Sequence, residues 1–165
     1  MLARKGPILL ADVTTLATMA AAAFSAATLL PGGSELVFVG FIAAGYPHPM
    51  MLFLVATAAN IAGGLTNWWI GTLIARGADS TTGHAWLERF RLPSDMVERV
   101  HRLFGRFGWA ALLLCWLPVI GDPITLVAGM ARYPFLPTLV LTGIARTIRY
   151  GVIWLGATGA IAALS

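Results

Sequence analysis

The fold is decided by residues 30–47, which read LPGGSELVFVGFIAAGYP, and by a second version at residues 117–134, LPVIGDPITLVAGMARYP. Both stretches begin with Leu-Pro, carry one acid four residues after the proline and end with Tyr-Pro. The matching positions are each 87 residues apart: Leu30, Pro31, Glu35, Tyr46 and Pro47 correspond to Leu117, Pro118, Asp122, Tyr133 and Pro134. A long apolar segment follows each copy. The chain is therefore predicted to contain one structural unit twice.

The sequence around these stretches is too poor in charge for a soluble protein. Of its 165 residues, 58% are hydrophobic and only 11% are charged, with a mean hydropathy of +0.81. A soluble domain has about 25% charged residues. Residues 36–75 and 13–34 contain no Asp, Glu, Lys or Arg, and both runs exceed the roughly 18 residues that indicate a membrane span. We expect a multi-pass integral membrane protein, which excludes a soluble enzyme and a disordered tail.

The positive charge balance indicates lipid contacts rather than nucleic acid binding. The formal net charge is +4, and the chain has no room for a soluble domain beside several spans. Arginines that flank apolar segments set orientation and contact anionic lipid headgroups. Because His48, His84 and His101 are far apart in the sequence, we expect neither a metal site nor a cofactor.

The order of apolar, broken and charged stretches predicts six segments in a single membrane domain of all-α class. They are an N-terminal helix (8–29), a first re-entrant hairpin (30–47), a transmembrane helix (49–75), an amphipathic connector helix (84–106), a second re-entrant hairpin (107–134) and a final transmembrane helix (135–163). Glycine and proline interrupt both hairpins, and we expect the hairpins to be formed by Pro31, Gly32, Gly33, Pro118, Gly121, Pro123 and Gly129. Such backbone is tolerated at membrane depth only inside protein or beside a wet cavity. Because one crossing separates the hairpins, they would enter from opposite faces as an inverted repeat. A pair of kinked helices is the alternative.

Two parts of this arrangement have more than one interpretation. Residues 8–29 either cross the membrane or form one leg of the first hairpin; Arg4 and Lys5 favour a cytoplasmic N-terminus and hence a crossing. Residues 76–106, which include the connector helix, carry six arginines and should face the cytoplasm. The connector's helical part, from Ser94, either lies in the membrane interface or packs on the protein itself.

Four ionisable residues, Glu35, Asp122, Arg146 and Arg149, stand in apolar surroundings. Each costs about 2.5–3.5 kcal/mol at the centre of a membrane helix. Because the four charges sum to zero, we expect them to pair inside the bundle. One interpretation is a purely structural salt-bridge core, and the other is a site for substrate and protons.

The second interpretation has a specific chemistry. Arg146 and Arg149 are three residues apart, so they share one helix face and match a phosphate group, which guanidinium groups bind through charge-assisted hydrogen bonds. The anion would displace a carboxylate, Glu35 or Asp122, which then takes up a proton.

Small and polar residues form one stripe in the segment 49–75, at Asn60, Gly63, Gly64, Asn67 and Gly71. The stripe indicates either close helix packing or a lipid path, which Asn60 and Asn67 would line together with Tyr150 of the final helix.

Four ordered motifs resemble the DedA superfamily of VTT-domain or SNARE-associated membrane proteins, and most of all its short YqaA-like branch. They are SAATLLPGGSE (25–35), NIAGGLTN (60–67), WLPVIGD (116–122) and RTIRY (146–150). The resemblance covers roughly residues 15 to 160 and implies two opposed re-entrant hairpins in the bacterial inner membrane. It also implies movement of undecaprenyl phosphate or phospholipid between leaflets, with Glu35 as the acid of the first hairpin. Asp122 departs from the family, because it stands where the main branch is basic, and we expect Arg146 and Arg149 to supply that charge.

These observations together predict a flippase or scramblase for an anionic lipid, linked to protons, and not an enzyme. A structural protein that organises the membrane without transport is the alternative. An intramembrane enzyme, for example a protease using Ser34 with His48, is a weaker alternative, because no orienting acid is evident beyond Glu35. The glycine stripes also leave room for a homodimer.

Overall fold

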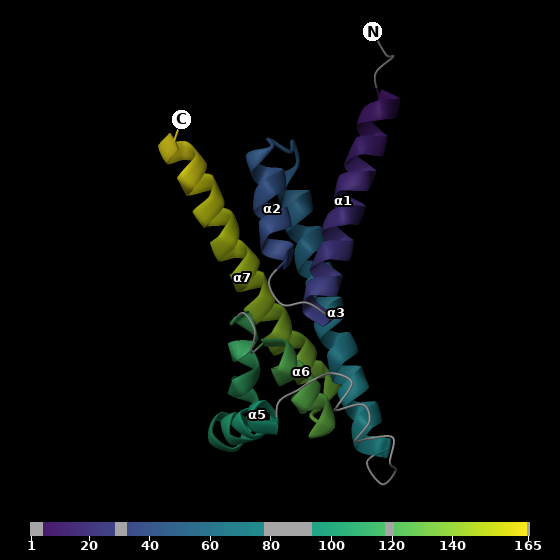
Figure 1. Cartoon of the computed structure of the whole chain (residues 1–165), viewed down its shortest axis with the longest axis vertical. Helices are drawn as coiled ribbons and strands as arrows, with labels where there is room; N and C mark the ends of the chain where they lie inside the picture. The colour runs from purple at the N-terminus through teal and green to yellow at the C-terminus, as the bar shows by residue number, and fades with distance from the viewer. Residues whose placement is uncertain (1–4, 29–32, 78–93, 118–120, 165) are drawn as a thin grey trace.

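The computed structural model describes residues 5–28, 33–77, 94–117 and 121–164, and within these ranges it is helical without any strand (Figure 1). The helices are α1 (Lys5–Thr28), α2 (Gly33–Ala43), α3 (Pro49–Gly77), α5 (Ser94–Phe107), the 3-10 helix η1 (Gly108–Trp116), α6 (Gly121–Met130) and α7 (Phe135–Leu164). The all-α class expected from the sequence is confirmed. Among the described helices, the segment Pro49–Arg76 has the length and hydropathy of a membrane span.

The two longest helices, α3 and α7, extend through both halves of the molecule, and shorter helices fill each half (Figure 1). α1 and α2 lie in the half that contains both chain termini, where α1 packs against α2 and α3. α5, η1 and α6 lie in the other half, where η1 packs against α6 and α7 and α6 packs against α3. α2 has 11 residues and α6 has 10, so each is only about 15–16 Å long at about 1.5 Å per residue.

The first broken segment differs from the hairpin that the sequence predicted within residues 30–47. Its central part is one regular helix, α2, because Gly40 is accommodated inside it at modest cost, and the chain turns only after Ala43. α1 runs toward the middle of the molecule and α2 runs back toward the same end, so the partner of α2 is α1 (Figure 1). Of the two interpretations of residues 8–29, this path favours a leg beside α2. Pro31, Gly32 and Pro118 lie outside the described residues.

The two short helices end in the same way, 87 residues apart. After α2, the amides of Gly45 and Tyr46 donate to Ile42 O (3.0 Å) and Phe41 O (3.1 Å). After α6, the amides of Arg132 and Tyr133 donate to Gly129 O (2.9 Å) and Ala128 O (2.9 Å) in the same pattern, that of a Schellman motif. Gly45 has φ 75° and Arg132 has φ 56°, so both occupy the left-handed position of this motif. The similarity between the two sequence stretches therefore extends to their backbone hydrogen bonds.

Arg132 takes a backbone conformation that usually favours glycine, and its side chain also makes a contact with α3. Its Nη2 donates to Ala75 O (3.3 Å), in the last turn of α3. Carbonyl groups in the last turn of a helix lack intrahelical partners and attract cations. This contact joins the ends of α6 and α3.

The apolar core is divided in two. One cluster, in the half with the termini, is formed by Met19, Ala23, Phe38, Leu52, Ala56 and Tyr150. The other is formed by Phe104, Ala111, Leu112, Cys115, Ile124, Val127, Ala128 and Ala145. Because Ala145 belongs to one cluster and Tyr150 to the other, the α7 residues between them, including Arg146 and Arg149, lie where the two clusters meet.

α5 packs on the protein itself through its apolar side. It contacts η1 and α6, and Phe104 is buried in the second core cluster while Glu98, Arg102 and Arg106 are exposed. This contact supports the interpretation of the connector as a packed helix. The connector's residues before Ser94 lie outside the part of the chain that the structure describes.

The crossing of α3 and α6 depends on two glycines. A Cβ built on Gly71 would collide with Leu126 O, and one built on Gly129 would collide with Trp68 O. Gly129, which was predicted to help form the second hairpin, lies within α6, where the absence of a side chain lets two helix backbones touch. Trp68 Nε1 adds a hydrogen bond to Tyr133 O (3.2 Å) beside this crossing.

We expect Gly129→Ala to destabilise the protein by about 1–3 kcal/mol or more, because backbone of α3 occupies the space that the new methyl group needs. Gly151→Ala is the matched control, since it is also a helical glycine but has no atom within 4 Å of the new Cβ. Thermal unfolding in detergent measures both. Equal midpoints for the two variants would contradict the close crossing.

Candidate functional site

The four charged residues that the sequence singled out form two ion pairs where the core clusters meet. Asp122, in the first turn of α6, pairs with Arg146 of α7. Glu35, in the first turn of α2, pairs with Arg149 of α7. The predicted mutual pairing is therefore confirmed. Each acid also lies at a helix N-terminus, where the helix dipole favours negative charge.

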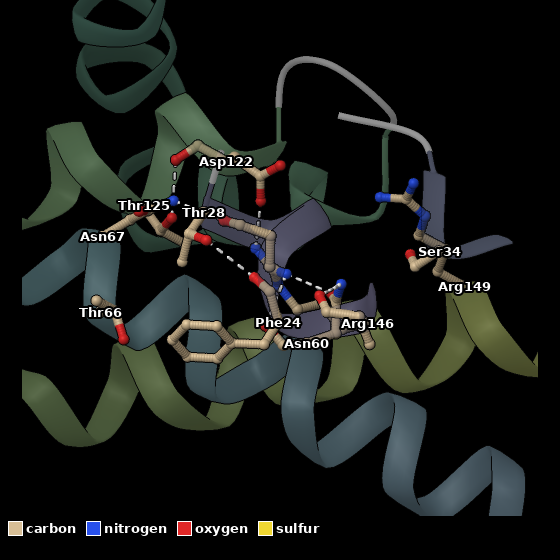
Figure 2. A network of polar contacts seen from close by, with 12 residues as sticks. Phe24, Thr28, Ser34, Asn60, Thr66, Asn67, Asp122, Thr125, Arg146 and Arg149 are labelled. Atoms are coloured by element: carbon tan, nitrogen blue, oxygen red, sulfur yellow. Dashed lines mark hydrogen bonds and ion pairs between the residues drawn. The ribbon is translucent and has the colours of Figure 1, made fainter. Parts of the chain in front are cut away.

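Arg146 is the more enclosed of the two arginines. Its side chain is 2% exposed, and its Nη2 donates to Asp122 Oδ1 at 2.7 Å. Its Nη1 donates both to the main-chain oxygen of Asn60 (2.9 Å) and to Asn60 Oδ1. Figure 2 shows these groups converging from α3, α6 and α7. A guanidinium fork is suited to such a junction, because it offers several donors in one plane.

Asn60 and Asn67 attach α1 to α3. Asn60 Nδ2 donates to Ala23 O (3.0 Å), and Asn67 Nδ2 donates to Ala27 O (2.8 Å). Both asparagines are buried, so in this conformation their side chains hold helices together rather than face an open path. That they line a lipid path stays a prediction. These side chains would face such a path only if α1 separated from α3.

The glycine stripe of α3 serves two different neighbours. A Cβ on Gly63 would lie 2.6 Å from Ala27 Cβ and 2.9 Å from Phe24 O, so this glycine lets α1 approach. A Cβ on Gly64 would lie 2.7 Å from Arg146 Nη2 and 2.9 Å from Arg146 Cζ. The guanidinium group of Arg146 therefore rests on bare backbone at Gly64. The sequence showed the stripe as a helix contact but did not show that one member accommodates an arginine.

The pair formed by Glu35 and Arg149 is more open. Arg149 donates from Nε (2.6 Å) and from Nη2 to the same oxygen, Glu35 Oε1. The side chains of Arg149 and Glu35 are 15% and 30% exposed. The third nitrogen of the guanidinium, Nη1, and the second carboxylate oxygen, Oε2, lie outside this pair.

The expectation that Arg146 and Arg149 grip one phosphate together does not describe this conformation. Although the two residues are three apart on α7, their guanidinium groups bind different carboxylates. The reason is that α2 and α6 come from opposite halves of the molecule, and each brings its acid to a different arginine (Figure 1).

Tyr150 belongs to the packed interior. Its side chain is 1% exposed, its OH donates to Ser34 Oγ (2.9 Å), and its ring meets that of Phe38 edge-on at 5.5 Å between centroids. Its predicted part in a lipid path stays a prediction.

Ser34 is buried near the start of α2, whereas His48 is exposed beyond the other end of this helix. The two residues therefore do not form the nucleophile and base of a protease.

The remaining predicted hairpin residues lie at helix starts. Gly33 begins α2, Gly121 begins α6, and Pro123 is the third residue of α6, where its missing N–H removes no intrahelical hydrogen bond. Within the described ranges, no three or more His, Cys, Asp or Glu residues are grouped as metal ligands would be.

Comparison with known proteins gives one family and several relatives. The VTT domain matches residues 30–157. Inner membrane protein YqaA of Escherichia coli K12 is 34% identical over 141 residues, covering 86% of this chain and 89% of YqaA. Inner membrane protein YqjA of the same strain is 34% identical over 120 residues, covering 66% of this chain and 50% of YqjA. Undecaprenyl phosphate transporter A of Staphylococcus aureus is 28% identical over 137 residues, covering 79% of this chain and 66% of that protein. No solved structure matches the chain.

We expect Gly64→Ala to displace the guanidinium group of Arg146 and to lower stability by about 1–3 kcal/mol. Gly143→Ala is the control, because it lies on α7 close to Arg146 and its Cβ would meet only Ile61 Cδ1 at 3.8 Å. Thermal unfolding of both variants is measured in two backgrounds. The first is the native sequence, and the second is a chain that carries Asp122→Asn and Arg146→Met together. The cost of Gly64→Ala should shrink in the second background; an equal cost in both would show that Arg146 is not the group displaced.

Proposed function

Because the chain belongs to the VTT domain family, we propose that it moves a phosphate-bearing anionic lipid, a phospholipid or a polyprenyl phosphate such as undecaprenyl phosphate, between the leaflets of a bacterial inner membrane. A relative named as an inner membrane protein supports the proposed membrane location. A relative of lower identity, named as an undecaprenyl phosphate transporter, supports a lipid phosphate as the transported molecule. The observation that carries the proposal is the charge-balanced layer of Glu35, Arg149, Asp122 and Arg146 between two apolar clusters.

The position of this layer fits the task of passing a headgroup. Gly64 and Arg149 stand near the midpoints of α3 and α7, the two long helices. Large apolar side chains are exposed along one stripe of α7, at Leu136, Val140, Ile144, Ile148, Val152 and Leu155. Such a stripe suits contact with acyl chains. Buried ion pairs give little net stability compared with apolar packing, so their presence in the membrane favours a functional role.

Exchange of partners gives a mechanism. A lipid phosphate competes with a carboxylate for an arginine, because guanidinium groups bind phosphate and carboxylate with similar geometry. The released carboxylate takes up a proton, which keeps a buried negative charge from standing alone. Protons are thus the proposed coupled partner.

The same proposal includes a topology. α1 with α2, and η1 with α6, form two re-entrant hairpins that enter from opposite faces, while α3 and α7 cross. The matching Schellman motifs and the short lengths of α2 and α6 support this arrangement. The six arginines of residues 76–106 outweigh Arg4 and Lys5, so the connector faces the cytoplasm and both chain termini face the periplasm.

Lipid movement is the first test. In liposomes containing the purified protein, a fluorescent anionic phospholipid in the inner leaflet becomes accessible to an added quencher only after crossing. We expect Glu35→Gln and Arg149→Gln each to slow this crossing by roughly tenfold or more, because each removes one member of an exchanging pair. Thr147→Val, an exposed change between the two arginines, is the matched control. Equal rates in all variants, or no transport at all, would favour the structural alternative.

Cysteine labelling tests the topology. In a Cys115→Ala background, single cysteines replace Lys5, His48, Glu98 and Ala163, and intact cells are treated with a membrane-impermeant maleimide. We expect labelling at positions 5, 48 and 163 and protection at 98 until the membrane is opened. Labelling of position 48 with protection at position 5 would instead mean that α1 crosses the membrane.

A further inference from the structure

We propose that the two ion pairs have different functions: Glu35 and Arg149 form the subsite that binds the headgroup phosphate of a lipid, whereas Asp122, Arg146 and Asn60 form a fixed unit that positions the helices around it. This division rests on the proposed function and assigns its ligand contact to one arginine.

The guanidinium group of Arg146 is closed to a ligand, although the side chain of Asp122 is 25% exposed. Arg146 is held by Asp122 and by two oxygens of Asn60, and Asn60 is itself bonded to Ala23 of α1. One side of the guanidinium group rests on Gly64. Arg146 Nε is buried and has no hydrogen-bond partner among the described residues. A ligand cannot reach this atom from the surface, because the whole residue is only 1% exposed. An anion would have to separate α3, α6 and α7 to reach it.

The pair of Glu35 and Arg149 can be approached without such a separation. It uses two nitrogens of Arg149 and one oxygen of Glu35, and Nη1 has no hydrogen-bond partner among the residues that the structure describes. Both side chains are partly exposed, at 15% and 30%, compared with 2% for Arg146. A phosphate oxygen can therefore bind Arg149 first and displace Glu35 afterwards.

The surface beside this pair identifies the source of the phosphate. Leu36, which follows Glu35, is 78% exposed, and Ile148 and Val152, which flank Arg149 on α7, are 53% and 56% exposed. The pair thus borders an apolar surface that acyl chains can cover. A lipid can place its phosphate on Arg149 while its chains stay on Leu36, Ile148 and Val152, whereas free phosphate gains nothing from these side chains.

Paired neutral variants separate the two functions. Removing one charge leaves a buried partner unpaired and destabilises the fold, but removing both members of a pair avoids this cost. The test therefore uses Glu35→Gln with Arg149→Gln as one variant, and Asp122→Asn with Arg146→Met as the other. Thr147→Val serves as an unrelated control.

The measurement is the rise in unfolding temperature of the purified protein, followed by tryptophan fluorescence, on addition of phosphatidic acid in mixed micelles. Phosphatidylcholine micelles and inorganic phosphate are the comparison probes. The wild-type chain and Thr147→Val should show the full rise with phosphatidic acid. The Glu35/Arg149 variant should lose at least roughly tenfold in apparent affinity for it. The Asp122/Arg146 variant should start from a lower unfolding temperature, because it also loses the hydrogen bonds from Arg146 to Asn60, but it should keep more than half of the rise.

Several results would overturn the assignment: loss of the rise in the Asp122/Arg146 variant, its survival in the Glu35/Arg149 variant, or an equal rise with inorganic phosphate alone. If a double variant does not fold, Arg149→Lys and Arg146→Lys take its place, and only the first should weaken binding. The expected binding pattern together with no lipid crossing in liposomes would refute the proposed transport and leave the binding site standing.

Discussion

The need to neutralise four charges inside an apolar bundle constrains the rest of this structure. Arg146 and Arg149 are fixed on one long helix, so the chain must bring two carboxylates to the middle of that helix. The short helices α2 and α6 meet this need because each begins beside the layer with its acid in the first turn. A helix that continued through the molecule would carry its first turn past the arginines.

The glycines are a second consequence of the same constraint. Bringing acids and arginines together requires helices to approach closely, and among the described residues close approaches occur at Gly63, Gly64, Gly71, Gly121 and Gly129. Gly63 allows α1 to lie on α3, and Gly71 with Gly129 allows α6 to lie on α3. Gly64 alone makes room for a charged side chain, which links helix packing directly to the ionic layer.

The repeat and the buried charges could be predicted from the sequence, because an 87-residue spacing and charges in apolar surroundings are local signals. The all-α class and the mutual pairing followed from them. The choice of partners could not be predicted, because it depends on the directions in which α2 and α6 arrive. For the same reason the sequence placed the whole first hairpin in residues 30–47. It left close helix packing and a lipid path both open for Asn60 and Asn67, whose amide groups bind carbonyl groups of α1 in the structure.

The zero net charge of the layer determines how it responds to a membrane potential. Moving one unpaired charge through 100 mV changes its energy by about 2.3 kcal/mol. Glu35 with Arg149 and Asp122 with Arg146 carry no net charge, so the field exerts no net force on either pair at rest. A phosphate that joins Arg149 without a proton on Glu35 would give the layer one negative charge, and the field would then act on it. In the proposed mechanism, proton uptake by Glu35 would restore electrical neutrality, and the loaded layer would then be as insensitive to voltage as the empty one.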